Sequence, residues 1–330
     1  MADRLRVRYC RRLMPHSVSA MFLREIPQYV RWADVVHLTA VYSFPTIPTL
    51  LTGKLLDKPL VWSPRGSLQR WRGTTRPQVK TIWELICRIA APKRLLLHAT
   101  SAEEARESQI HFPGIAPVVI ANGVEIPINS ERTKQDGVLR LLYLGRLHPK
   151  KAIENLLMAC KLLNGNAPQY TLTIAGSGDD AYEASLRCEI ERLALSHQAT
   201  MIGAVGGEAK RRAFENADVV VVPSHTENFG VIVAEALAHA VPVIASKGTP
   251  WKKLEEIGCG LWVDNEPESL ANAIVRINGM PLDDMGQRGR LWMIAQFSWA
   301  KIAAEMLNCY ESLAATRLSG YEGRAVGPNI

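Results

Sequence analysis

From residue 139 onward, short apolar runs alternate with longer runs of helical periodicity, and this alternation limits the fold more than any other feature of the chain. The apolar runs are rich in Val, Ile and Leu and are typical of buried strands: LRLLYLG, YTLTIAG, ATMIGAV, VVVVPS, VPVIAS and GLWVD. The intervening runs, such as IENLLMACKLLN and PESLANAIVRI, repeat apolar residues every three or four positions. Apolar strands alternating with helices predict a doubly wound α/β domain with a parallel sheet.

The N-terminal part carries a thinner version of the same pattern. DVVHLTA, PLVWSP, RLLLHAT and PVVIANG resemble strands, and helical patterns occur near residues 17–31, 77–91 and 102–111. With 330 residues the chain can hold two cores, so we expect two doubly wound Rossmann-like domains. The predicted boundaries are 1–128 for the first domain, 129–138 for a linker, 139–298 for the second domain, and 299–330 for a C-terminal helix packing back towards the first.

Several classes of protein are disfavoured by composition. Prolines 45 and 48 interrupt the most apolar stretch, so no membrane-spanning segment is expected, and the start lacks the apolar core of a secretory signal. Six scattered cysteines, without a Cys-x-x-Cys pair, argue against a zinc site or a disulfide framework and fit a reducing cytoplasm.

The charge is unevenly distributed. Residues 1–128 contain 18 Lys and Arg against 9 Asp and Glu, a net +9, whereas the remainder is −2, giving +7 overall. A basic first half suits an anionic partner such as phosphorylated lipid, a membrane surface or nucleic acid. Solvated arginines without a partner remain an alternative, and sparse aromatic residues disfavour nucleic acid.

We expect the ligand-binding residues in the turns that follow the strands, because ligands of doubly wound sheets bind beyond the carboxyl ends of the strands. After LRLLYLG come Arg146, Lys150 and Lys151, followed by a helix beginning near Ile153. Cations beside a helix N-terminus suit a diphosphate. A solvated basic loop is the alternative.

The turn after YTLTIAG contains Gly176, Ser177 and Gly178, then Ala181, matching the loose dinucleotide pattern G-x-G-x-x-A. The next strand ends MIGAVGG, without the acid that a dinucleotide ribose requires. We interpret these glycines as a close backbone approach to a ligand, or as a tight turn, and disfavour an oxidoreductase.

Two glutamates lie eight positions apart in HTENFGVIVAEALAHAVPVIAS. Glu227 follows a strand, and Glu235 lies in the second turn of a helix that should begin near Phe229 and Gly230. Two carboxylates facing one cleft could accept hydrogen bonds from vicinal sugar hydroxyls. The alternative is a surface loop followed by an amphipathic helix with one acid in water. Cations, acids and exposed amides on one rim, with Thr249 on a neighbouring turn, favour a nucleotide sugar over nicotinamide.

The ordered motifs YLGRLHPKKAIENLL, LTIAGSGDD and ADVVVVPSHTENFGVIVAEALAHAVPVIASKGTPWKKL resemble the donor half of retaining glycosyltransferases of family 4, which have the two-domain GT-B fold. The resemblance covers residues 139–315 strongly and 34–125 weakly; in the weaker part, WSPRGSL resembles members that build surface polysaccharides. It implies a metal-independent enzyme without a cofactor, acting on a nucleotide-diphosphate sugar and a glycan or polyprenyl-linked acceptor at the inner membrane face.

The resemblance also implies residue roles. Arg146 and Lys151 would hold the diphosphate, and Glu227 would bind donor-sugar hydroxyls. Glu235 would bind the ribose. The remaining donor contacts would come from the turn after Met201 and from Gly176, Ser177, Gly178, Asn228, Phe229 and Gly230.

The first half departs from the family pattern. It has no glycine before Gly53, so it lacks the family's first strand and glycine-rich loop. The family's His-x-His is His37-Leu38-Thr39 here, and His37 is either a core histidine or an acceptor-side residue. Arg65 is an acceptor-side candidate or a turn cap. A catalytically silent nucleotide-sugar-binding protein or a truncated paralogue is therefore the alternative function.

Overall fold

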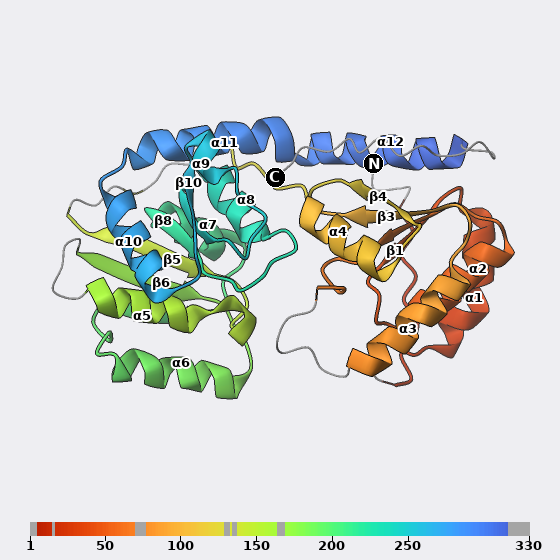
Figure 1. The fold of residues 1–330 in the computed structure, drawn as a ribbon, viewed down its shortest axis with the longest axis horizontal. Helices are drawn as coiled ribbons and strands as arrows, with labels where there is room; N and C mark the ends of the chain where they lie inside the picture. The colour runs from red at the N-terminus through yellow and green to blue at the C-terminus, as the bar shows by residue number, and fades with distance from the viewer. Residues whose placement is uncertain are drawn as a thin grey trace. The chain divides into compact units, whose positions relative to one another are not determined.

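The computed structural model describes residues 5–14, 17–69, 77–128, 133, 137–163 and 169–315. Contacts between Cα atoms divide the chain into two compact units (Figure 1). The first unit comprises residues up to 120 together with those from 305, and the second comprises residues 121–304. The expected linker at 129–138 falls largely outside the described residues.

The first unit is built on a four-stranded parallel sheet in the order β1-β2-β3-β4. Its strands are β1 (Val36–Thr39), β2 (Leu60–Ser63), β3 (Leu95–Ala99) and β4 (Ala116–Val119). Its helices are α1 (Ala20–Trp32), α2 (Thr46–Leu55), α3 (Pro77–Ala90), α4 (Ala102–His111) and the C-terminal part of α12 (Trp299–Ala315).

The two faces of this sheet are covered by different helices. Because the strands follow one another in chain order, right-handed crossovers place α2, α3 and α4 on one face. There Trp62 and Leu97 pack with Leu50 of α2 in one buried cluster. On the other face, Val61 and Leu96 pack with Leu313 of α12. In this unit, the C-terminal helix α12 covers the face of the sheet that a second set of crossover helices covers in a doubly wound domain.

The second unit is built on a six-stranded parallel sheet in the order β10-β9-β8-β5-β6-β7. Its strands are β5 (Leu139–Leu144), β6 (Tyr170–Ala175), β7 (Ala199–Gly203), β8 (Val219–Val222), β9 (Val243–Ser246) and β10 (Gly260–Val263). Its helices are the 3-10 turn η2 (Pro149–Lys151), α5 (Ile153–Leu163), α6 (Asp180–Arg192), α7 (Gly207–Glu215), α8 (Val231–Ala238), α9 (Leu254–Ile257), α10 (Pro267–Asn278) and α11 (Leu282–Phe297), and α12 begins here.

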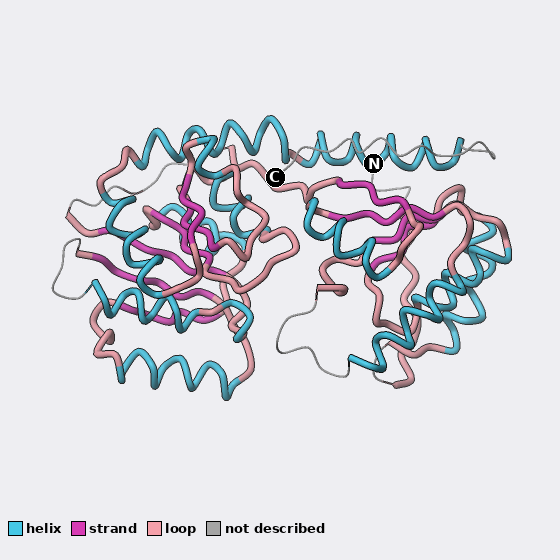
Figure 2. The backbone as a smooth tube through the Cα atoms, in the orientation of Figure 1, coloured by secondary structure: helices cyan, strands magenta, loops and turns pink. Residues whose placement is uncertain are grey.

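Helices lie on both sides of this second sheet, as Figure 2 shows. All six strands coincide with the runs predicted from the sequence, so the predicted α/β fold with two parallel-sheet Rossmann-like domains is confirmed. The strand order reverses between β5 and β8: later strands are added outward on either side of this pair. Such a reversal is where doubly wound sheets bind ligands.

The structure contains two long helices that the sequence analysis did not predict. In α2, Pro48 lies in the first turn, where its missing N–H removes no helical hydrogen bond. In α11, a Cβ at Gly286 would lie 1.9 Å from the carbonyl oxygen of Ala240. The glycine, which weakens a helical pattern in the sequence, is what lets α11 pack on the segment following α8.

None of the described helices combines the length and apolarity needed to cross a bilayer. All six cysteines lie within the described residues, and none forms a disulfide.

Candidate functional site

A cavity of about 230 Å³ lies at the reversal point, against the carboxyl ends of β5 and β8. It is bounded by the end of β5, by Lys151, by the loop after β8 and by the first turn of α8. Its lining residues are Tyr143, Leu144, Gly145, Lys151, Val222, Ser224, Glu227, Asn228, Gly230, Val231 and Ile232.

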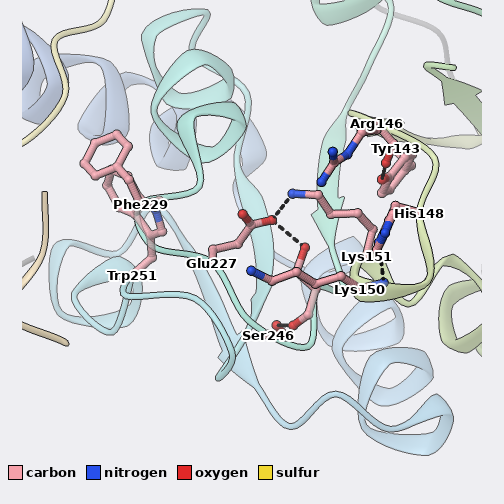
Figure 3. Close-up of polar contacts among 10 residues, drawn as sticks. Tyr143, Arg146, His148, Lys150, Lys151, Glu227, Phe229, Ser246 and Trp251 are labelled. Carbon is pink, nitrogen blue, oxygen red and sulfur yellow. Dashed lines mark hydrogen bonds and ion pairs between the residues drawn. The ribbon is translucent and has the colours of Figure 1, made fainter. Parts of the chain in front are cut away.

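Glu227 is held in this cavity by both its backbone and its side chain. Its N–H donates to the carbonyl of Gly248 at 2.8 Å. Its carboxylate accepts a hydrogen bond from Ser224 Oγ at 2.7 Å and forms an ion pair with the Lys151 ammonium (Figure 3). The carboxylate side chain is 10% exposed and Lys151 is 20% exposed, so the pair is largely shielded from water. A shielded carboxylate requires such donors.

Gly248 explains how the Glu227 loop can lie so close to the turn after β9. A Cβ at this position would lie 2.3 Å from the carbonyl oxygen of His225. Only glycine allows this approach, and a glycine in a turn was the one sign of it in the sequence.

Lys151 is positioned by the 3-10 turn η2. His148 caps this turn, accepting from the N–H of Lys150 at 3.1 Å, and its carbonyl accepts from the N–H of Lys151 at 2.8 Å. The carbonyl of Lys150 accepts from the N–H of His225 at 2.9 Å, which ties the loop after β5 to the loop after β8. The sequence placed the cations and Glu227 on separate turns, and the structure joins them.

Three cations gather around His148. Burial lowers the pKa of His148, and the nearby charges of Arg146, Lys150 and Lys151 lower it further. Arg146 extends toward the Lys151–Glu227 pair in Figure 3, and its carbonyl accepts from Tyr143 Oη at 2.9 Å. Arg146 and His148 line a second hollow, of about 640 Å³. Arg146 is the one Lys or Arg among the described residues that line it, and an arginine guanidinium is a good donor to a diphosphate.

Gly176 and Gly178 bring the turn after β6 against the loop after β5. A Cβ on Gly176 would lie 1.8 Å from the carbonyl oxygen of Gly145, and one on Gly178 would lie 2.1 Å from that of Leu147. The N–H of Leu147 donates to the carbonyl of Ser177 at 2.9 Å. Residues 176–178 also line the 640 Å³ hollow. The G-x-G pattern therefore serves a close backbone approach between two loops.

The side chain of Phe229 is buried in the protein and does not line the cavity. Its ring meets that of Trp251 edge-on with centroids 5.2 Å apart, and its carbonyl accepts from Trp251 Nε1. Gly230, with φ of 76°, then starts α8. Thr249 is also buried, with its hydroxyl donating to the carbonyl of Ser246 at 2.8 Å, so its side chain lies beneath the rim.

Glu235 lies in the second turn of α8 and pairs with Lys210 of α7 at 2.6 Å. It lines a third hollow, of about 680 Å³, with Lys210 and His239. The residues expected to line a single groove are divided among three hollows, and the hollow of Glu235 shares none of its described lining residues with the other two. Leu144 and Gly145 border both of the first two. Lys210 and Ser224, which fix the two glutamates, were not identified from the sequence because no spacing marks them.

In the first unit, both ring nitrogens of His37 are engaged. Nδ1 is hydrogen-bonded to Tyr310 Oη, and Nε2 lies 2.6 Å from Ser63 Oγ. Ser63 Oγ lies 2.7 Å from His98 Nδ1, and His98 Nε2 lies 2.8 Å from the carbonyl oxygen of Ile120. Since that carbonyl can only accept, the donors run in one direction: Tyr310 to His37 to Ser63 to His98 to the carbonyl. Burial lowers the pKa of the half-buried His37, and the nearby charge of Arg65 lowers it further; its acceptor-side role stays a prediction.

Arg65 occupies an exposed turn at the carboxyl end of β2, with a left-handed φ of 53°. The turn is tied to the buried Glu104 of α4, whose Oε1 accepts from the N–H of Gly66 at 2.5 Å. Oε2 of Glu104 accepts from both the N–H and the hydroxyl of Thr100 at 2.7 Å. The acceptor-side role of Arg65 stays a prediction.

Across the described part of the chain, no group of three or more His, Cys, Asp and Glu side chains is arranged to hold a metal ion.

Cationic and acidic groups thus lie around the reversal point of a parallel sheet, and comparison with known proteins gives the class of this chain. The family model for glycosyl transferases group 1 matches residues 126–292. This stretch covers half of the chain and includes Arg146, Lys151, Glu227 and Glu235. The protein belongs to the glycosyl transferases group 1 family.

Curated relatives agree with this assignment. An uncharacterised glycosyltransferase of Methanocaldococcus jannaschii is 33% identical over 186 residues, which is 54% of this chain and 46% of that relative. The phosphatidyl-myo-inositol mannosyltransferase of Mycobacterium tuberculosis is 26% identical over 297 residues, covering 85% of this chain and 74% of the relative. The chain thus spans about half to three quarters of these relatives.

Among solved structures, HepE of Anabaena in complex with UDP superposes with a TM-score of 0.73 at 19% identity, covering 89% of this chain and 82% of HepE. This similarity concerns the fold and confirms a GT-B fold with two Rossmann-like domains.

Proposed function

We propose that the protein is a retaining glycosyltransferase of family 4. It would transfer a hexosyl group from a nucleotide-diphosphate sugar to a hydroxyl of a glycan or polyprenyl-linked glycan. The observation that carries the proposal is the Lys151–Glu227 pair at the reversal point of the sheet, beside the hollow that Arg146 lines. A relative named as a mannosyltransferase and a structural neighbour in complex with UDP support it.

Arg146 and Lys151 would hold the diphosphate. An ammonium has three N–H donors, of which Glu227 takes one, so Lys151 can donate to a phosphate oxygen without leaving Glu227. Fixed positive charge stabilises the diphosphate as it departs. The two cations would perform the role that a metal ion performs in other transferases, so no metal and no cofactor is required in this proposal.

The two glutamates would recognise hydroxyls at opposite ends of the donor. Glu227, next to the cations, would accept from hydroxyls of the transferred sugar, with backbone groups of Asn228 and Gly230 along the same cavity. Glu235, fixed by Lys210 in the third hollow, would accept from the ribose hydroxyls. Carboxylates are acceptor-only groups, which matches hydroxyl donors.

In the transfer step, the bond between sugar C1 and the diphosphate oxygen breaks and a bond between C1 and the acceptor oxygen forms on the same face. The acceptor proton passes to the departing phosphate oxygen. Retention then requires no carboxylate nucleophile, and Glu227 acts by binding. The basic first half is compatible with a cytoplasmic protein held peripherally at the inner face of an anionic membrane, where a polyprenyl-linked acceptor would be found.

Replacement of the two paired residues tests the proposal. Lys151→Ala and Glu227→Ala are each expected to lower kcat for sugar transfer by about 100-fold or more, because each removes a group that stabilises the departing diphosphate or orients the sugar. Lys247→Ala is a matched control, since Lys247 forms an exposed pair with Asp264 on a neighbouring loop. Thermal unfolding would confirm that each variant is folded. Full transfer activity in either site variant would contradict the proposal.

A thermal-shift screen with UDP, GDP, ADP and CMP separates the alternatives. Ligand that binds the folded state must raise the melting temperature. One nucleoside diphosphate is expected to do so in the wild-type chain and not in Lys151→Ala. Nucleotide binding without transfer or donor hydrolysis across many acceptors would instead identify a catalytically silent binding protein.

A further inference from the structure

Helix α3 carries an apolar stripe on its outer side. Five large aliphatic residues of this helix are exposed: Val79, Ile82, Leu85, Ile86 and Ile89. Positions 79, 82, 86 and 89 follow the three–four spacing that aligns side chains along one face of a helix. Their exposed fractions run from 42% for Ile86 to 65% for Ile89. Within the described chain, this is the densest run of exposed aliphatic residues on one helix.

The stripe is not the core-facing side of the helix. Glu84, Cys87 and Ala90 are the buried residues of α3. The Glu84 carboxylate accepts from Tyr42 Oη and is hydrogen-bonded to His111 Nδ1 at 2.9 Å, which holds this side of α3 to the end of α4. The helix therefore carries apolar side chains on its solvent-facing side as well as on its core-facing side. Figure 1 shows α3 lying along the surface of the unit beside α2.

Cations flank the stripe. Arg88 of α3 is exposed and donates from Nε to the carbonyl of His111 at 2.8 Å. Lys54 of α2 donates from Nζ to the carbonyl of Ile89 at 2.6 Å, which places its charge beside the C-terminal end of the stripe. Both bind neutral carbonyls and so keep their charge.

The acidic residues on the neighbouring helices are mostly paired or buried. Helices α1, α2 and α3 carry five Lys and Arg and two Glu, of which Glu25 is paired with Arg8 and Glu84 is buried. Helix α4, which the Glu84–His111 contact holds to α3, adds Arg106 and three Glu; Glu103 is paired with Arg106, and Glu104 is buried. An apolar stripe flanked by the exposed Arg88 and Lys54 is complementary to a bilayer with negatively charged headgroups and a hydrocarbon interior.

We infer that the outer face of α3 is the membrane-contacting surface, with its aliphatic side chains in the boundary between headgroups and acyl chains of an anionic bilayer and its cations on the lipid phosphates. This inference deepens the proposed function and rests on its membrane association, because it names the surface that would keep the first unit at a lipid-linked acceptor. It does not involve the donor site.

Flotation with lipid vesicles tests the inference. The full chain is expected to float with vesicles of 70% phosphatidylcholine and 30% phosphatidylglycerol. The bound fraction should fall at least fivefold with vesicles of pure phosphatidylcholine, which carry no net charge. It should also fall at least fivefold in 0.5 M NaCl, because salt screens the cations. Ile82→Glu/Ile89→Glu is expected to lower binding to the anionic vesicles at least tenfold. Ile82→Ser/Ile89→Ser, which adds no charge, should also lower it.

The matched control is Val275→Glu/Leu291→Glu, which changes two exposed aliphatic residues of α10 and α11 in the second unit and should bind like the wild type. Equal binding of the α3 variants and the wild type would overturn the inference, as would absence of wild-type binding. Loss of a dimer, rather than of vesicle binding, in the α3 variants would also overturn it and assign the stripe to a second copy of the chain. Nucleotide-induced thermal shifts of the same variants report separately on the donor site, which should be unaffected.

Discussion

A methyl group on Gly176 would lie 1.8 Å from the carbonyl oxygen of Gly145, a backbone atom that cannot turn aside as a side chain would. Gly176 also has a φ of 152°, which L-residues rarely adopt. We therefore expect Gly176→Ala to lower the free energy of unfolding by about 2 kcal/mol or more, because the loops after β5 and β6 must separate. Urea denaturation of the purified variant would measure this.

Gly279→Ala is the control for that substitution. Gly279 has a φ of −87°, and an added Cβ would come no closer than 3.7 Å to the carbonyl oxygen of Arg276. Its effect should stay within about 0.5 kcal/mol. Since Gly176 lines the hollow of Arg146, nucleotide affinity should fall in Gly176→Ala and not in the control. Equal stabilities of the two variants would show that the loops accommodate the methyl group.

At the scale of helices and strands, the elements predicted correctly are those in which apolar residues repeat regularly within one segment. The six strands of the second unit are short apolar runs with clear limits, and all six are present. Helices α2 and α11 were missed because Pro48 and Gly286 weaken a helical pattern, although tertiary structure tolerates the first and needs the second. A pattern within one segment cannot show that a glycine will meet a carbonyl from another.

The candidate site shows the same limit. Glu227 and Lys151 were identified from their places after strands, but their pairing depends on which strands are neighbours. Lys210, which fixes Glu235, lies in an ordinary charged helix, and nothing in its surroundings in the sequence distinguishes it from Arg211. Side chains whose role is to hold another side chain become visible only in three dimensions.

Helix α12 provides a test at this scale, because its C-terminal part covers one face of the first sheet. Leu313 is buried against Val61 and Leu96, and the Arg94 guanidinium donates to the Leu313 carbonyl at 2.8 Å. Leu313→Ala should lower the free energy of unfolding by about 2–3 kcal/mol through the cavity it leaves. Leu307→Ala, on an exposed position of the same helix, should change it by less than about 0.5 kcal/mol. Similar losses in both variants, measured by urea denaturation, would mean that α12 is stabilised by its helical propensity rather than by this packing.

For the molecule as a whole, buried histidines make stability depend on pH. Burial lowers the pKa of His98 to about 4, and it also lowers those of His37 and His239. An unfolded chain titrates its histidines near 6.5, so between about pH 6.5 and 4 the unfolded state binds more protons than the folded state. Stability is therefore complete above this range and is lost as the pH falls through it. Protonated His98 could no longer accept from Ser63, which would interrupt the hydrogen-bonded series that ends at Tyr310.

His98→Gln separates this contribution from other acid-sensitive groups. With a folded pKa of about 4, His98 alone should remove about 2 kcal/mol of the free energy of unfolding between pH 7 and pH 5. The glutamine has no titrating ring, so its variant should start less stable at pH 7 and lose about 2 kcal/mol less on acidification. Urea denaturation at half-unit steps of pH would measure the two profiles. If those of the wild type and His98→Gln run parallel, His98 titrates alike in the folded and unfolded chain, and its burial does not lower its pKa.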